Sequence, residues 1–96
     1  MVREREYSPN QLKNTIEKGG IGVIANGPNT AEMCDFLGHV GFDAAFVDFE
    51  HGKVSWSELP DITRACELWG MSSVVRVNKL DEAQILRTLD QGASAV

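Results

Sequence analysis

Two short segments carry the side chains best suited to acid–base and anion chemistry. In Asp48-Phe49-Glu50-His51-Gly52, a histidine follows two carboxylates, and a carboxylate neighbour makes a histidine a good general base. In Val74-Val75-Arg76-Val77, an arginine interrupts an apolar run. An unpaired buried guanidinium costs several kcal/mol, so we expect Arg76 to face an anion.

Each candidate also has a purely structural interpretation. Arg76 would then form an ion pair with Asp48 or Glu50, because buried pairs of this kind need not be functional. His51 would be an ordinary loop histidine. Asp90 falls in the last turn of a predicted helix, where a carboxylate opposes the helix dipole at a cost of ~0.3–1 kcal/mol. From the residues alone, a solvated surface acid is the better interpretation of Asp90.

The elements that must position these side chains alternate between helix and strand. Capping residues predict helix starts at Ser8, Thr30, Ser55 and Asp81. Apolar runs predict strands at residues 21–25, 44–48 and 73–77, and the beginning of a fourth at 93–96. Strands that alternate with helices are typical of parallel βαβ units, so the sequence predicts an α/β fold.

In parallel α/β proteins the ligand site lies beyond the carboxyl ends of the strands. The three predicted strands deliver most of their polar residues to this one rim, namely Asn26, then Asp48, Glu50 and His51, then Arg76 and Asn78. Side chains alternate along a strand, so Asp48 shares a face with Phe46, and Arg76 shares a face with Val74. If both faces point into a barrel, the carboxylate and the guanidinium converge near its mouth.

Composition excludes several other classes. The formal net charge is −5 and no basic run occurs, which argues against a nucleic-acid partner. No segment approaches the ~20 apolar residues of a membrane helix, and the N-terminus lacks the apolar core of a signal peptide. We therefore expect no membrane association and a cytoplasmic location. Cys34 and Cys66 are expected to be buried free thiols.

These residues carry a family resemblance. Gly41-Phe42-Asp43, running into Asp48-Phe49-Glu50-His51-Gly52, resembles the G-F-D…D-x-E-H-G segment of the HpcH/HpaI aldolase family. The Arg76 strand, followed by Asp81, Ile85 and Leu89-Asp90-Gln91-Gly92-Ala93, resembles that family's next segment. Order and spacing agree from about Leu12 to Val96.

The resemblance implies a (β/α)8 TIM barrel, of which residues 1–96 form a partial domain that stops near the fourth strand. It implies a class II aldehyde-lyase that cleaves a 4-hydroxy-2-oxo acid reversibly to pyruvate and an aldehyde through a pyruvate enolate. It also implies a small-molecule 2-oxo acid as partner, a homo-oligomer, and a divalent metal (Mg²⁺, Mn²⁺ or Co²⁺). The metal ligands are expected beyond Val96, with none in this chain, and Glu50 is not assigned as one.

The same resemblance implies roles for individual residues. His51 would be the general base, and Arg76 would bind the pyruvoyl oxygens and stabilise the enolate. Asp90 would raise the basicity of His51, which reverses its interpretation as a surface acid, and Asp48 is the rival for that role. Relatives often carry a Trp soon after the glycine of the first strand, whereas Gly22 is followed by Val23-Ile24-Ala25-Asn26. The aldehyde-side pocket is therefore not predicted.

Two other functions are compatible with the sequence. One is a related enolate-forming lyase or decarboxylase on the same barrel. The other is a non-catalytic, truncated α/β fragment that serves for interaction or folding. Four strands cannot close a barrel, so we expect the 96-residue chain alone to be inactive and to associate through its open edges.

Overall fold

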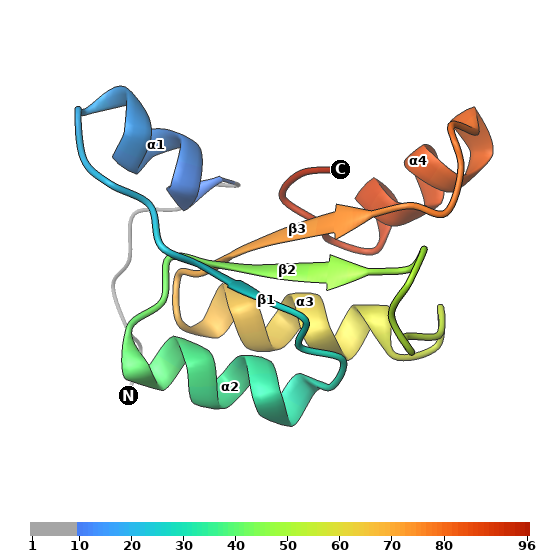
Figure 1. Cartoon of the computed structure of the whole chain (residues 1–96), viewed down its shortest axis with the longest axis horizontal. Coiled ribbons are helices and arrows are strands. Elements are labelled where there is room, and N and C mark those ends of the chain that lie inside the picture. The colour runs from blue at the N-terminus through green and yellow to red at the C-terminus, as the bar shows by residue number, and fades with distance from the viewer. Residues whose placement is uncertain (1–9) are drawn as a thin grey trace.

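The computed structural model describes residues 10–96, which form a parallel sheet of three strands with helices between them (Figure 1). The elements are α1 (Gln11–Glu17), β1 (Ile24–Asn26), α2 (Ala31–Val40), β2 (Ala44–Asp48), α3 (Leu59–Leu68), β3 (Ser72–Arg76) and α4 (Glu82–Asp90). The strand order is β1-β2-β3. The predicted α/β class with parallel strands is therefore confirmed.

Local capping explains where two of the helices begin and one ends. Thr30 Oγ1 accepts a hydrogen bond from the Met33 N–H at 3.1 Å, and Asp81 Oδ1 accepts one from the Ala83 N–H at 3.0 Å. Helix α2 ends at Gly41, whose φ of 114° is readily adopted only by glycine. None of the helices in residues 10–96 is long and apolar enough to cross a membrane.

One predicted helix start is wrong by several residues. Helix α3 begins at Leu59 rather than next to Ser55. Glu58 accepts a hydrogen bond from the Ser55 N–H, but the Ser55 hydroxyl contacts Ser57 instead of capping an amide. Pro60 lies in the first turn of α3, where its missing N–H does no harm, and favours the later start.

At the N-terminal end, Asn10 is the cap of α1. Its side chain accepts a hydrogen bond from the Lys13 N–H. The predicted cap, Ser8, lies outside the described residues.

The observed limits of two strands differ from the predicted ones, and for β1 the hydrogen-bond pairing with β2 explains the difference. Strand β1 begins at Ile24 instead of residue 21 because it pairs with β2 only from Ile24 opposite Ala44 onward. Strand β3 covers Ser72–Arg76, one residue earlier than predicted. The expected fourth strand is represented by a parallel bridge between Val74 and Ala95, with the Val75 N–H donating to the Ala95 carbonyl at 3.0 Å.

One face of the sheet carries the core. Helices α2 and α3 pack side by side against it, below the strands in Figure 1. Ala45, Val47 and Val75 point to this side and join a buried cluster with residues of both helices. Cys34 and Cys66 belong to that cluster and are free thiols, 0% and 1% exposed, as predicted.

The opposite face of the sheet is more open. Along β2 and β3, Phe46, Asp48 and Val74 are half-buried and Arg76 is exposed. Helix α1 lies on this side, near the start of the strands (Figure 1). It is tied there by a 2.9 Å hydrogen bond from the Leu12 N–H to the Ser72 hydroxyl of β3. The strand ends that carry the candidate site are therefore left accessible.

Candidate active site

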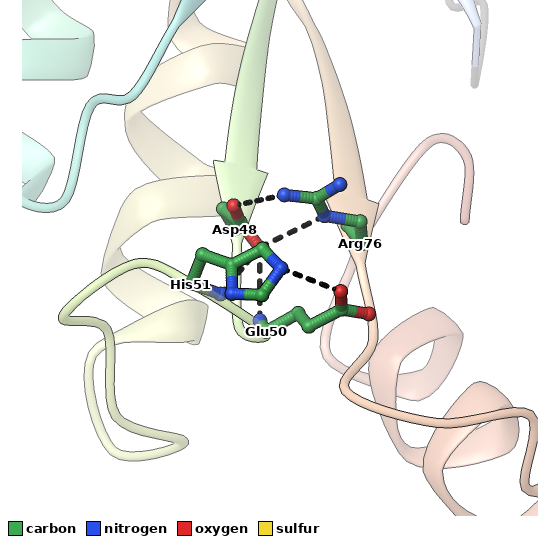
Figure 2. Close-up of polar contacts among 4 residues, drawn as sticks. All are labelled: Asp48, Glu50, His51 and Arg76. Atoms are coloured by element: carbon green, nitrogen blue, oxygen red, sulfur yellow. Dashed lines mark hydrogen bonds and ion pairs between the residues drawn. The ribbon is translucent and has the colours of Figure 1, made fainter.

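Asp48 and Arg76 meet at the carboxyl ends of neighbouring strands. The register of β2 and β3 places them directly opposite one another. Arg76 Nε donates to Asp48 Oδ1 at 3.1 Å and Arg76 Nη2 donates to Asp48 Oδ2 at 2.5 Å (Figure 2). This two-point geometry is the strong form of an arginine–carboxylate pair. Arg76 thus has the anionic partner that the sequence led us to expect, and that partner is Asp48.

The Asp48 carboxylate also shapes the loop that follows β2. Its Oδ1 atom accepts hydrogen bonds from the N–H groups of Glu50 at 2.8 Å and His51 at 3.1 Å. Gly52 completes the turn, because a Cβ at this position would lie 2.2 Å from the Asp48 carbonyl oxygen. Asp48 therefore positions His51 through its backbone and makes no contact with the imidazole among the described interactions.

The imidazole of His51 has a different carboxylate partner. His51 Nε2 lies 2.8 Å from Glu50 Oε1 (Figure 2). The two side chains are 69% and 39% exposed, so the pair is open to solvent and to a substrate. The sequence marked Glu50 as an acidic neighbour of His51 and as a possible partner of Arg76, but did not choose between Asp48 and Glu50 as the partner of the imidazole. The adjacency of Glu50 and His51 in D-x-E-H is the signal that favours Glu50.

Asp90 is not brought to this cluster within the chain. It is the exposed last residue of α4, and the chain then returns to the beginning of β3, where the Ser94 N–H donates to the Ser73 carbonyl at 2.9 Å. His51 follows the other end of the neighbouring strand. A helix that succeeds a strand in a βα unit runs back toward the start of the sheet, which separates the two residues.

The charges in the cluster stabilise one another. The bidentate bond from Arg76 holds the pKa of Asp48 well below its usual range. Partial burial opposes this shift, and the N–H groups of His51 and Glu50 support it. In return, the bond to Asp48 raises the pKa of Arg76. The guanidinium also lies over the Phe46 ring, 5.6 Å from its centroid, a cation–π arrangement. Arg76 is therefore a fixed positive charge at the strand ends.

The residues present do not fit a metal site. Across residues 10–96, no three His, Cys, Asp or Glu side chains gather closely enough to hold a metal ion. The carboxylates nearest to the cluster are already engaged, Asp48 by Arg76 and two N–H groups and Glu50 by His51. No catalytic step is therefore assigned to a metal on these residues.

Comparisons with known proteins place this arrangement in context. No protein-family profile matches the chain. The chain is 34% identical, over 85 residues, to a 2-dehydro-3,6-dideoxy-6-sulfogluconate aldolase of Pseudomonas putida. The aligned region is 88% of this chain but 32% of that protein.

Solved structures show the same relationship. An HpcH/HpaI aldolase from Desulfitobacterium hafniense DCB-2 superposes with a TM-score of 0.75 at 27% identity, over 85% of this chain and 32% of that chain. The citrate synthase SbnG superposes with a TM-score of 0.75 at 27% identity, over 86% of this chain and 34% of that chain. The chain thus spans about a third of the length of the relatives it matches. Sequence identity to one aldolase and the shared fold of an HpcH/HpaI aldolase together support a relationship to the HpcH/HpaI aldolase family, over about a third of the length of those proteins.

Proposed function

We propose that the protein carrying this chain is a lyase that cleaves a 4-hydroxy-2-oxo acid reversibly to pyruvate and an aldehyde. The observation that carries the proposal is the cluster at the ends of β2 and β3, where Arg76 is fixed by Asp48 and His51 by Glu50. The aldolases among its relatives support a lyase in general. The substrate and the metal requirement belong to the proposal.

Arg76 is the group proposed to bind the pyruvoyl oxygens. Carbon–carbon cleavage leaves a pyruvate enolate, whose negative oxygen needs a positive charge that is already in place. Asp48 engages Nε and Nη2 of the guanidinium, and arginine carries five N–H donors in all. The other donors lie on a side chain that is 43% exposed, so they are available to a substrate carboxylate or enolate.

His51 is the proposed general base. When Nε2 donates to Glu50, the lone pair of Nδ1 is free to accept a proton. In the cleavage direction that proton comes from the 4-hydroxyl group of the substrate. Asp48 contributes to this step only by holding the loop that carries His51.

Asp90 can raise the basicity of His51, as the resemblance implies, only if a second subunit brings the two residues together. Because it lies at the other end of the strands from His51 within one chain, a contact would require a neighbouring subunit of the proposed homo-oligomer. Glu50 needs no such assembly. Parallel substitutions of the two acids therefore separate the two arrangements.

The proposal includes a divalent metal, Mg²⁺, Mn²⁺ or Co²⁺, whose ligands belong to residues of the protein other than those described. When bound, a metal of this kind would supply Lewis-acid chemistry. The chain's own residues supply the guanidinium and the base.

A pyruvate-release assay on 4-hydroxy-2-oxo acids tests the function. It is run on the 96-residue chain and on any longer natural chain that contains it, with Mg²⁺ or Mn²⁺ and then with a chelator. We expect turnover in the longer chain, loss of turnover with chelator, and no turnover in the 96-residue chain. Undiminished turnover after chelation sinks the class II assignment, and an absence of pyruvate from every 2-oxo acid tried sinks the aldolase.

The citrate synthase among the structural neighbours supports a second candidate, another enolate-forming lyase or decarboxylase on the same barrel. The assay distinguishes it, because substrate would then disappear without equimolar pyruvate and aldehyde. Carbon dioxide release would identify a decarboxylase.

A further inference from the structure

Three side chains contact one another in a stack, two from the connection between β2 and α3 and one from α4. Phe49 is the first residue after β2, and Trp56 lies in the turn before α3. Their rings are stacked, with centroids 4.7 Å apart and planes inclined by 24°. The guanidinium of Arg87, in α4, lies over the Trp56 ring, 4.5 Å from its centroid. Trp56 therefore contacts both Phe49 and Arg87.

The contact between Phe49 and Trp56 holds together the two ends of the loop that carries the candidate base, His51. Phe49 and Trp56 flank the segment that contains Glu50 and His51. Holding the two ends of a loop together removes much of its conformational freedom. On its inner side the same loop is held by Asp48 Oδ1, which accepts from the N–H groups of Glu50 and His51. The loop is thus fixed at its first turn and at its base.

Helix α4, which carries Arg87, is held to α3 at its C-terminal end. Thr63 of α3 donates a 2.7 Å hydrogen bond to the Gln91 carbonyl, just after the end of α4. Thr88, next to Arg87, is 0% exposed. The guanidinium therefore extends over Trp56 from a helix that is anchored to α3, and it links the loop after β2 to the helix after β3.

We propose that Phe49, Trp56 and Arg87 form a positioning stack that holds the His51 loop in its place at the end of β2. Among the described interactions their side chains contact neither the Asp48 carboxylate nor the Arg76 guanidinium, so they are not catalytic. The Phe49 N–H donates to the Arg76 carbonyl at 2.9 Å, which is a backbone contact between the strands. Their effect on loop order stands by itself, and only their effect on turnover rests on the proposed function.

Exchange of the Glu50 and His51 amides with water, followed by NMR, tests the stack in the 96-residue chain. Trp56→Leu keeps an apolar side chain but removes the aromatic face, and we expect both amides to exchange about tenfold faster. Arg87→Gln removes only the cation, with an expected increase of about two- to fivefold. Arg87→Lys restores a cation over the ring and should stay within about twofold of the wild type.

A second signature and a control make the test specific. Ring currents of Trp56 should move the Arg87 side-chain protons upfield, and Trp56→Leu should abolish that shift. Arg64→Gln is the matched control, because Arg64 is an exposed arginine of α3 that pairs with Asp61. It should leave the Glu50 and His51 amides unchanged. Unchanged loop amides in Trp56→Leu overturn the proposal, and so does equal acceleration of the core amides of Ile62 and Val75.

The activity arm separates this inference from the proposed function. In a longer natural chain that releases pyruvate, Trp56→Leu should lower kcat more than it changes KM. If no chain releases pyruvate, the proposed function fails while the exchange result still decides the stack. If pyruvate is released and Trp56→Leu leaves both loop exchange and kcat unaltered, the stack fails and the function stands.

Discussion

Asp48 and Arg76 occupy opposite positions in the β2–β3 register, and their side chains close a bidentate ion pair at the strand ends. A single carboxylate thereby fixes a guanidinium and, through two N–H groups, the turn that carries His51. The positive charge and the candidate base are coupled through Asp48. A change at Asp48 should therefore disturb both.

Two substitutions of Arg76 should separate the effect of its positive charge on kcat from the effect of its two-point hydrogen bonding. Arg76→Ala should lower kcat for pyruvate release by about 10²–10³-fold, the loss typical when one stabilising donor to an oxyanion is removed. Arg76→Lys should recover only part of that loss, because an ammonium cannot pair with a carboxylate at two points. The control is Arg64→Ala, at an exposed site on α3, which should retain wild-type kcat. Full activity in Arg76→Ala removes the enolate role.

The Asp48–Arg76 pair should survive mild acid. Arg76 holds the pKa of Asp48 below its usual range, so the pair's contribution to stability is fully present above about pH 4, the ordinary value for aspartate. It is lost only as the pH falls toward the lowered value in the folded chain. The Arg76 Nε–H resonance, followed from pH 7 downward, should stay constant to below about pH 4. A midpoint near pH 4 or above contradicts the pair.

Parallel substitutions of Glu50 and Asp90 identify the acid that serves His51. If the pair seen in the chain acts in catalysis, Glu50→Gln should reduce kcat by about 10-fold or more, within the range for a disturbed general base. Asp90→Asn should reduce it only if a neighbouring subunit delivers Asp90. Sedimentation of the same samples shows whether the protein is oligomeric. A loss in Asp90→Asn alone would transfer the role from Glu50 to Asp90.

Gly52→Ala should damage the His51 loop. The added Cβ would lie 2.2 Å from the Asp48 carbonyl oxygen, and overpacking of this kind typically costs about 1–3 kcal/mol. We expect a lower free energy of unfolding in urea and faster exchange of the His51 amide. Lys53→Ala, at the next and exposed position, is the control and should change neither. Wild-type stability in Gly52→Ala would show that the turn has another conformation.

The two thiols should react only when the core opens. Cys34 and Cys66 are almost fully buried between α2 and α3, and the contact with Cys34, together with burial, raises the pKa of Cys66. The thiolate is the reactive form, so the raised pKa slows the reaction of Cys66, and burial shields both thiols from the reagent. Both should therefore be inert to a disulfide reagent in the folded chain and should react quickly in urea. Rapid reaction of either thiol without denaturant would contradict the packing of α2 on α3.

Local signals predicted most of the fold. Thr30 and Asp81 are caps as expected, Gly41 ends its helix, and the apolar runs became parallel strands. The errors in the strand limits fell at boundaries set by long-range pairing. Strand β1 starts late because its partner strand starts at Ala44, and no signal within residues 21–25 contains that information.

The amino-acid sequence by itself determined which residues reach the strand-end rim and which face of its strand each one takes, because alternation along a strand is a local property. Only the tertiary structure decided which of these side chains pair with one another. Asp48 bonds Arg76 because the register sets them opposite, and His51 meets Glu50 because Asp48 and Gly52 turn the loop tightly. Asp90 stays apart because α4 runs back toward the start of the sheet. Register and helix direction depend on contacts between distant segments, and spacing along the chain does not encode them.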